Sequence, residues 1–429
     1  MKTKTLSLLA SSLLASASFG AGFGLYEGSA FGVANMPELM AKGGRASALY
    51  YNPAAMATST GTVAEVGSFM VKPHLSVVGT DPYTGRFYHQ SPDRVWWPIP
   101  NAYVVHQADD DLWLGLGAFS RAGLGGNFGE KWLGRYNMTE VEILSLAVNP
   151  NVAFRPTDWL AVSAGLDVGY FTIDLRQAID VAGAAGLRPY NCTEPSPYDV
   201  FQKLDGDDWA LGWDVGLQIQ PVDRLSIGLA YHSEQRFTVR GTGTYRVPAA
   251  VAAMAPGAFR PTKMAGKVSL PAEWMAAASL DVTDWLTLSA GLIYSEWSCW
   301  DELDIGFKGP SPIPGVPRLH SEKNWDDVFR YTGGASIRFT DSFSGRFSFT
   351  WDQSPINENH VDYLVPADDR HIWAFGLSYE TGSWTFDLTY FVEHIHLLEY
   401  PGRIQDGVLG GDFKSGSARA FAAAISHQF

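Results

Sequence analysis

The side chains that could do chemistry are few and scattered in this 429-residue chain. His394 and His396 would share one face of a strand with Glu393 and Glu399 nearby, and imidazole with carboxylate is a ligand set that binds metal ions. The same residues also suit the solvated end of a strand, which is the interpretation we favour. The sequence therefore predicts no metal site.

The cysteines and the hydroxyl side chains give no catalytic pattern. Cys192 and Cys299 could form a disulfide in an exported chain, but the sequence does not fix the distance between them. No arrangement of Ser, His and Asp typical of nucleophilic catalysis is recognisable. We predict a protein that is not an enzyme, with no catalytic residue and no cofactor.

The N-terminus predicts export. Lys2 and Lys4 precede an apolar run from Leu6 to Ala17, and small residues follow it, so residues 1–20 are expected to be a signal peptide cleaved after Gly20. The run is shorter than the roughly 20 apolar residues that a membrane-spanning helix needs. The formal net charge of −14 argues against nucleic acid as a partner.

Large apolar side chains alternate with small or polar ones along much of the remaining chain. The pattern is clear in residues 160–170, 225–232 and 384–392, where the two kinds of side chain would project from opposite faces of a strand. Each run is about ten residues long, enough to cross a bilayer when the strand is tilted. The pattern indicates strands with one face toward lipid.

The spacing of the turns predicts how these strands are connected. Asp158, Asp223, Asp284 and Asp341 mark short turns that lie 57 to 65 residues apart, which suits two spanning strands, one short periplasmic turn and one long extracellular loop. Unpaired strand edges are not tolerated in lipid, so the sheet must close. We predict an all-β fold, a 14-stranded antiparallel transmembrane β-barrel.

The barrel is expected to occupy residues 62–429, with extracellular loops at about 179–208 and 247–267. The second loop is rich in Ala and Met, which suits packing on the barrel rim, ligand binding, or both. Residues 21–61 are rich in glycine and do not alternate. A segment of that length without a strand, at the mouth of a barrel, predicts a plug inside the lumen.

Several motifs resemble one family of outer-membrane proteins, the long-chain fatty acid transporter (FadL/TodX, OMPP1) family. The similar stretches run through essentially the whole chain after the signal peptide: AGFGLYE from residue 21, the triplet Asn52-Pro53-Ala54, WALGWDVGLQ at 209–218, SLPAEWMAAASLDV at 269–282, SEWSCW at 295–300 and the block at 326–356.

The resemblance implies a passive transporter that takes hydrophobic compounds into the outer membrane without energy coupling. A ligand would be caught between extracellular loops and then held in an inner pocket touched by the mature N-terminus. Phe23, Leu25, Tyr26 and Arg176 are the ligand-binding residues that this implies. Arg176 could instead be a lumen side chain paired with Asp174 or another acid, and this alternative stays open.

The resemblance also implies a lateral exit where the third strand bends inward. Gly123 matches the glycine at this kink, and glycine permits a bend or bulge in a strand. Asn52, Pro53 and Ala54 match residues of the plug, called the hatch in this family, that sit against the kink. These four residues are the predicted hatch and lateral gate.

The substrate stays open between classes of apolar compound. Long-chain fatty acids are the first expectation, aromatic hydrocarbons or other apolar compounds the second, and a porin for polar solutes or a barrel that hydrolyses lipids are further alternatives. The expected partners are a hydrophobic small molecule, outer-membrane lipid with lipopolysaccharide, and the barrel-assembly machinery through the C-terminal strand that ends at Phe429. We expect a monomer in the outer membrane.

Overall fold

The protein is a closed β-barrel with helices inside one end. The computed structural model describes residues 22–309, 311–313, 316–365, 368–396 and 399–429, and the predicted signal peptide lies outside the described residues. Antiparallel pairing joins each wall strand to the next, and β1 pairs with both β3 and β21, which closes the sheet. The predicted all-β, 14-stranded antiparallel barrel is confirmed.

The fourteen wall positions follow the chain in order, and several of them consist of two consecutive strands. They are β1 (Thr62–Thr80), β3 (Trp97–Asp109), β4 with β5 (Leu112–Phe119, Gly123–Asn127), β6 (Glu140–Thr157), β7 (Leu160–Asp180), β8 (Asp199–Val222), β9 with β10 (Leu225–His232, Gln235–Arg246), β11 with β12 (Thr262–Leu270, Glu273–Asp281), β13 with β14 (Leu286–Ser295, Glu302–Phe307), β15 with β16 (Arg318–Glu322, Val328–Arg338), β17 (Phe343–Asp352), β18 (Arg370–Thr381), β19 (Trp384–Ile395) and β21 (Gly411–Gln428).

The remaining elements are short and lie in the lumen or the loops. No helix in the described part of the chain is long and apolar enough to cross a membrane. These elements are α2 (Ala30–Lys42), α3 (Ala48–Tyr51), α4 (Val181–Ala184), α5 (Ala249–Met254), the 3-10 helices η1 (Pro53–Thr58), η2 (Trp297–Cys299), η3 (Glu358–His360) and η4 (Ile404–Asp406), and the small strands β2 (Phe87–Gln90) and β20 (Glu399–Tyr400).

The wall strands alternate between an apolar outer face and a polar inner face. In β8, Leu211 and Trp213 are exposed on the outer face, whereas Asp214 is buried on the inner face. In β18, Leu377 is exposed and Ser378 is buried in the same way. An exposed apolar belt and a polar interior are what a barrel needs when lipid surrounds it.

The structure shortens both of the long loops that the sequence predicted. β7 and β8 remain paired as far as Asp180 and Asp199, so the loop predicted at 179–208 spans 181–198. β10 ends at Arg246 and β11 begins at Thr262, which places the other loop at 247–261 rather than 247–267. Beyond the lipid the outer face needs no apolar side chains, so these strands continue without the alternation that marks them in sequence.

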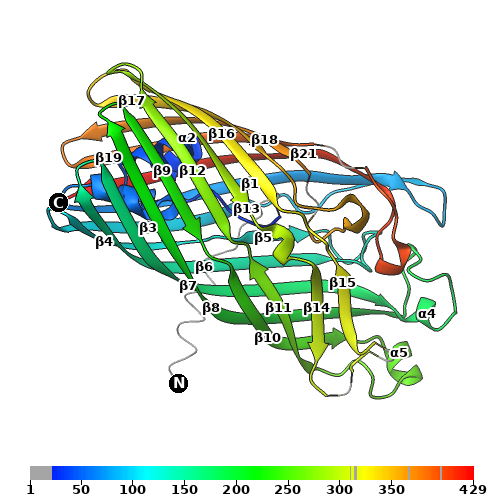
Figure 1. Cartoon of the computed structure of the whole chain (residues 1–429). Coiled ribbons are helices and arrows are strands. Elements are labelled where there is room, and N and C mark those ends of the chain that lie inside the picture. The colour runs from blue at the N-terminus through cyan, green and yellow to red at the C-terminus, as the bar shows by residue number, and fades with distance from the viewer. Residues whose placement is uncertain (1–21, 310, 314–315, 366–367, 397–398) are drawn as a thin grey trace.

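Residues 22–61, which we call the N-terminal segment, fold inside the barrel. α2 contacts wall strands from several sides of the lumen, among them β9, β12, β16 and β19. Figure 1 shows it enclosed at the end of the barrel where the C-terminus lies, while α4 and α5 lie in loops at the opposite end. The Ser29 side chain caps α2 by accepting from the amide of Gly32, and Gly43 ends the helix with a φ of 77°.

Candidate functional site

The third wall position consists of two strands with a break between them. β4 pairs with β3 as far as the pair Ala102 and Ala118, but β5 pairs only with β6 within the described residues. Residues 120–122 separate the two strands. The ladder between β3 and its neighbour is therefore interrupted beyond Ala118, and the wall has a gap in its hydrogen bonding there.

The start of the N-terminal segment supplies the missing backbone partner. The Leu25 amide donates to the Arg121 carbonyl at 2.9 Å, and the Gly123 amide donates to the Phe23 carbonyl at 3.0 Å. Gly24 and Ala122 form the antiparallel bridge between these two bonds. Phe23, Leu25 and Gly123, which the sequence singled out, therefore meet at the break in the wall.

The Ser145 hydroxyl holds the other side of the broken strand. It accepts from the amides of Arg121 and Ala122 at 3.1 and 2.7 Å and donates to the Ala122 carbonyl at 3.0 Å. One side chain on β6 thus replaces part of the strand ladder. Sequence reasoning missed Ser145, because a serine on the lumen face of a strand is common and carries no motif.

The gap between β3 and β5 is filled by an indole ring. A Cβ atom placed on Gly125 would lie 2.9 Å from the ring of Trp97, closer than real Cβ contacts allow. Gly125 therefore has to lack a side chain for Trp97 to pack against it. The Trp97 ring thus seals the wall with side-chain atoms at the stretch where β3 and β5 do not pair.

Phe23 packs into a cluster of tryptophans inside the barrel. Its ring centroid lies 5.0 Å from that of Trp297, 4.8 Å from Trp300 and 5.9 Å from Trp325. The first two contacts are edge-to-face, an arrangement favoured by the charge distribution of aromatic rings. Aromatic rings therefore surround Phe23 next to the break in the wall.

Tyrosine hydroxyls hold the backbone next to Phe23. Tyr50 donates to the Leu25 carbonyl, and Tyr51 donates to the Tyr26 carbonyl at 2.8 Å. Burial raises the pKa of Tyr51 and of Tyr50 above the ordinary tyrosine value, so both phenols stay neutral donors at physiological pH. The Tyr26 hydroxyl bonds the Ser295 hydroxyl at 2.8 Å.

Asn52 lies against β8 rather than against the broken strand. Its side-chain amide donates to the carbonyls of Met40 and Leu217 at 2.9 and 3.1 Å, and its oxygen accepts from the Ala54 amide. η1, which begins at Pro53, contacts β4 and β6 to β9. The Asn52 side chain thus anchors the N-terminal segment to β8, while η1 also contacts β4 in the third wall position.

A cavity of about 270 Å³ lies among the extracellular ends of the strands and the loops. Its apolar walls come mainly from β7, β8, β14, β15 and the loop between β14 and β15, and its polar walls include both cations and acids. The apolar lining includes Leu175, Ile179, Leu204, Ile305, Ile313 and Leu319, and the charged lining includes Arg176, Asp180, Lys323 and Asp362.

The cations of this cavity are already paired. Arg176 bonds Asp174 at 3.0 Å and Glu140 at 2.7 Å, and its side chain is 39% exposed. Lys323 is buried in an ion pair with Asp362. The acid-paired alternative for Arg176 is therefore what the structure contains, and the guanidinium still reaches the wall of the cavity.

Comparison with known proteins decides the family. The model of the outer membrane protein transport family (OMPP1/FadL/TodX) matches residues 11–421. The chain belongs to this family. It is an outer-membrane transporter of hydrophobic compounds, and the transport proteins that make up the family agree with the prediction that the chain is not an enzyme.

Relatives and solved structures extend over most of the chain. A 47 kDa outer membrane protein of Pasteurella multocida is 27% identical over 344 residues and 76% of each chain, and a long-chain fatty acid transport protein of Escherichia coli is 22% identical over 88% of each. A Pseudomonas aeruginosa FadL homologue has a TM-score of 0.80 at 19% identity over 95% of this chain and all of that one. The Ralstonia pickettii toluene transporter TbuX has 0.65 at 17% identity over 93% and 100%.

The other candidate sites of the sequence are not assembled. Cys192 and Cys299 are both free thiols. His394 and His396 belong to no group of three potential metal ligands among the described residues. The group that does form is Asp167, Asp214 and His232, which sequence reasoning missed because its members lie on three different strands.

Proposed function

We propose that this transporter takes up long-chain fatty acids by capture in the outer cavity, transfer to the tryptophan cluster, movement of the N-terminal segment and sideways release through the broken third strand. The observation that carries the proposal is the pairing of Phe23 and Leu25 with residues 121–123. A ligand that displaces Phe23 from the tryptophans must pull on the same backbone bonds that occupy the break. Binding and opening are thereby coupled.

The fatty acid assignment draws on the names of the curated relatives and on the outer cavity. Its apolar walls suit an acyl chain, and Arg176 offers a guanidinium for a carboxylate if Asp174 or Glu140 releases it. Phe23 and the three tryptophans offer a second apolar site. Transport would need no energy source, because an apolar molecule is already more stable in the membrane than in water.

Neutral aromatic hydrocarbons are the second candidate, and one observation favours them. Both cations of the outer cavity are held by acids, so a carboxylate must compete with Asp174, Glu140 or Asp362 for its partner. A neutral ligand has no such competition. The edge-to-face tryptophan cluster also suits an aromatic ring.

Uptake assays separate the two candidates. The wild-type chain and the variants Arg176→Gln and Phe23→Ala are expressed in a Gram-negative host that lacks its own long-chain fatty acid transport protein, and uptake of labelled oleate and of labelled toluene is measured. For a fatty acid transporter we expect oleate uptake to fall about tenfold in either variant, since losing a charge-assisted contact costs about 1.5–3 kcal/mol. Toluene uptake insensitive to Arg176→Gln, with no oleate uptake in the wild type, would favour the hydrocarbon candidate.

A further inference from the structure

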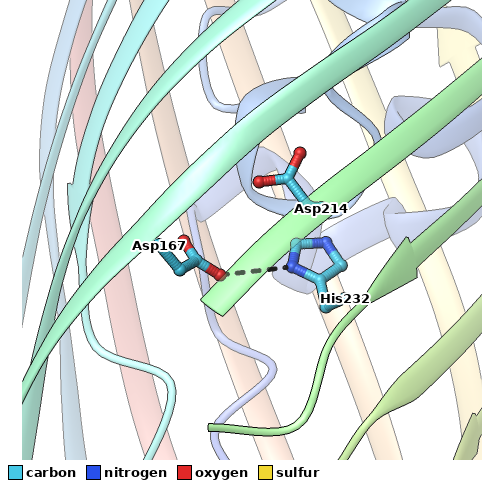
Figure 2. A group of neighbouring side chains, drawn as sticks. All are labelled: Asp167, Asp214 and His232. Carbon is cyan, nitrogen blue, oxygen red and sulfur yellow. Dashed lines mark ion pairs between the residues drawn. The ribbon is translucent and has the colours of Figure 1, made fainter. Parts of the chain in front are cut away.

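A buried group of two carboxylates and one imidazole lies on the inner face of three neighbouring strands. Asp167 comes from β7, Asp214 from β8 and His232 from the end of β9, and Figure 2 shows the three side chains close together, with Asp167 facing the His232 ring. None of them is more than 2% exposed. One ligand atom of each lies within 4.8 Å of those of the other two.

The His232 ring is the member that the protein does not satisfy. Neither of its nitrogens has a hydrogen-bond partner. Nδ1 points toward the Asp167 carboxylate at 3.8 Å, which is too long for a hydrogen bond (Figure 2). Buried polar side chains almost always have a partner, and imidazole nitrogens beside two carboxylates are groups that can share a metal ion as theirs.

The charges around the group call for a dication. Arg121 pairs with Asp167 at 3.3 Å and with Glu273 at 3.0 Å. Three carboxylates against one guanidinium leave a formal charge of −2 when the imidazole is neutral. A proton on His232 would remove only half of that charge, whereas one divalent cation would cancel it. Uncompensated charge is strongly disfavoured in a buried site.

Neighbouring amides orient the two carboxylates. Asn149 donates to Asp167 Oδ1 at 2.8 Å and to Asp214 Oδ2 at 2.6 Å, and Asn151 donates to Asp214 Oδ1 at 2.6 Å. Each carboxylate oxygen has a second lone pair that these bonds leave available. Supporting hydrogen bonds of this kind fix ligand carboxylates around metal ions.

We propose that Asp167, Asp214 and His232 form a binding site for a divalent transition metal ion. One imidazole nitrogen with two carboxylate oxygens is a ligand set that zinc and its neighbours accept, and hard cations such as magnesium are disfavoured by the imidazole. Zn²⁺ holds such ligands at about 2.0–2.2 Å, so the three atoms have to converge by roughly 1 Å.

The site lies one side chain away from the break in the wall. Arg121 binds Asp167 through its guanidinium, and its carbonyl accepts from Leu25. A cation bound to Asp167 would weaken the hold of that carboxylate on Arg121 by repelling the guanidinium. Metal binding would therefore alter how firmly the Arg121 side chain ties residues 120–122 to β7.

Metal analysis of the refolded full chain tests the site. Because the group is buried, wild type is unfolded in urea, refolded into detergent with Zn²⁺, passed over a chelating resin and assayed by mass spectrometry for bound metal. His232→Ala and the nearly isosteric Asp214→Asn test the ligands. His396→Ala is the matched control, because it removes an exposed imidazole that lies 3.3 Å from a second imidazole, that of His371.

The expected result is about one zinc per chain in wild type and His396→Ala, and less than about a tenth of that in His232→Ala and Asp214→Asn. Heat-dependent migration on a gel shows which variants are folded. The zinc content of whichever ligand variant is folded, His232→Ala or Asp214→Asn, decides the test. Zinc should also raise the temperature at which wild type loses its compact band. No zinc in wild type, equal zinc in a folded ligand variant, or loss only in His396→Ala would overturn the proposal.

Discussion

Two parts of the barrel wall satisfy their backbone hydrogen bonds in different ways. β7 and β8 are paired without interruption from Leu160 and Ile219 to Asp180 and Asp199. The third wall position stops pairing with β3 after Ala118, and its next residues bond the N-terminal segment and a serine hydroxyl instead. Every backbone group must be satisfied inside a bilayer, so a wall can open only where a removable partner stands in for the neighbouring strand.

Glycine alone does not produce the break. Gly165 and Gly169 lie in β7, and Gly333 lies in β16, yet β7 stays paired with β8, and β16 with β13 and β17, at these glycines. The broken strand differs because its residues 121–123 bond the backbone of Phe23 and Leu25 and the Ser145 hydroxyl, beyond the point where pairing with β3 ends. The comparison indicates that the position of the break depends on the alternative hydrogen-bond partners, the N-terminal segment and the Ser145 hydroxyl, rather than on glycine content.

The largest expected effect on uptake comes from a substitution that favours continuous strand pairing across the break. Gly123→Val adds a branched side chain that favours extended, paired backbone, so we expect uptake to fall about tenfold, the factor given by about 1.4 kcal/mol of bias against the open state. Gly333→Val is the control, because a Cβ there meets nothing within 4 Å in the intact strand β16. Uptake of labelled substrate, at equal amounts of folded barrel, measures both.

An intermediate effect is expected from loosening the N-terminal segment at its other end. Asn52→Ala leaves the carbonyls of Met40 and Leu217 without their donor, which costs about 1–3 kcal/mol of anchoring. We expect planar-bilayer recordings to show ion-conducting events and uptake to fall about threefold. Asn101→Ala, which removes a buried amide whose oxygen has no partner, should change neither. A silent bilayer for Asn52→Ala would contradict the anchoring role.

The smallest effect is one of stability. Ser145→Ala removes the acceptor of the Arg121 and Ala122 amides, so the free energy of unfolding should fall by about 1–3 kcal/mol and the Ala122 amide should exchange faster with deuterium. Ser163→Ala is the comparison on the uninterrupted strand, since that buried hydroxyl has no partner. Urea unfolding from lipid vesicles measures both variants, and equal losses would remove the special role of Ser145.

The sequence predicted the wall better than the opening. Alternation in residues such as Leu211, Trp213 and Asp214 follows directly from a wall between lipid and lumen, so strand type and barrel closure could be predicted. Phe23, Leu25 and Gly123 were singled out through the resemblance, and the structure brings them together. Their mutual contact could not follow from local pattern, because about a hundred residues separate the partners.

The remaining differences have physical causes too. Arg176 sits two residues from Asp174 on one strand face, a pair the sequence allowed but could not distinguish from a free cation. Asn52 could not be placed, because its position depends on how η1 packs against β8. His232 and its carboxylates lie 18 to 65 residues apart in sequence, and the register of the neighbouring strands β7, β8 and β9 brings them together.

The central claim is that the N-terminal segment must leave the broken strand for transport to occur, and a reversible lock tests it most directly. Gly24 and Ala122 face each other in a non-hydrogen-bonded antiparallel pair, where Cα atoms are about 4.5 Å apart and a disulfide can form. The lock is Gly24→Cys with Ala122→Cys, made after Cys192 and Cys299 are replaced by serine.

A second disulfide, Thr332→Cys with Thr350→Cys, joins the intact strands β16 and β17, where the two hydroxyls lie 2.9 Å apart, and serves as the control. We predict that oxidation reduces uptake through the Gly24 and Ala122 variant by at least about tenfold, that a reductant restores it, and that the control is unaffected. Uptake that is equally fast with the first disulfide formed and reduced would contradict the account.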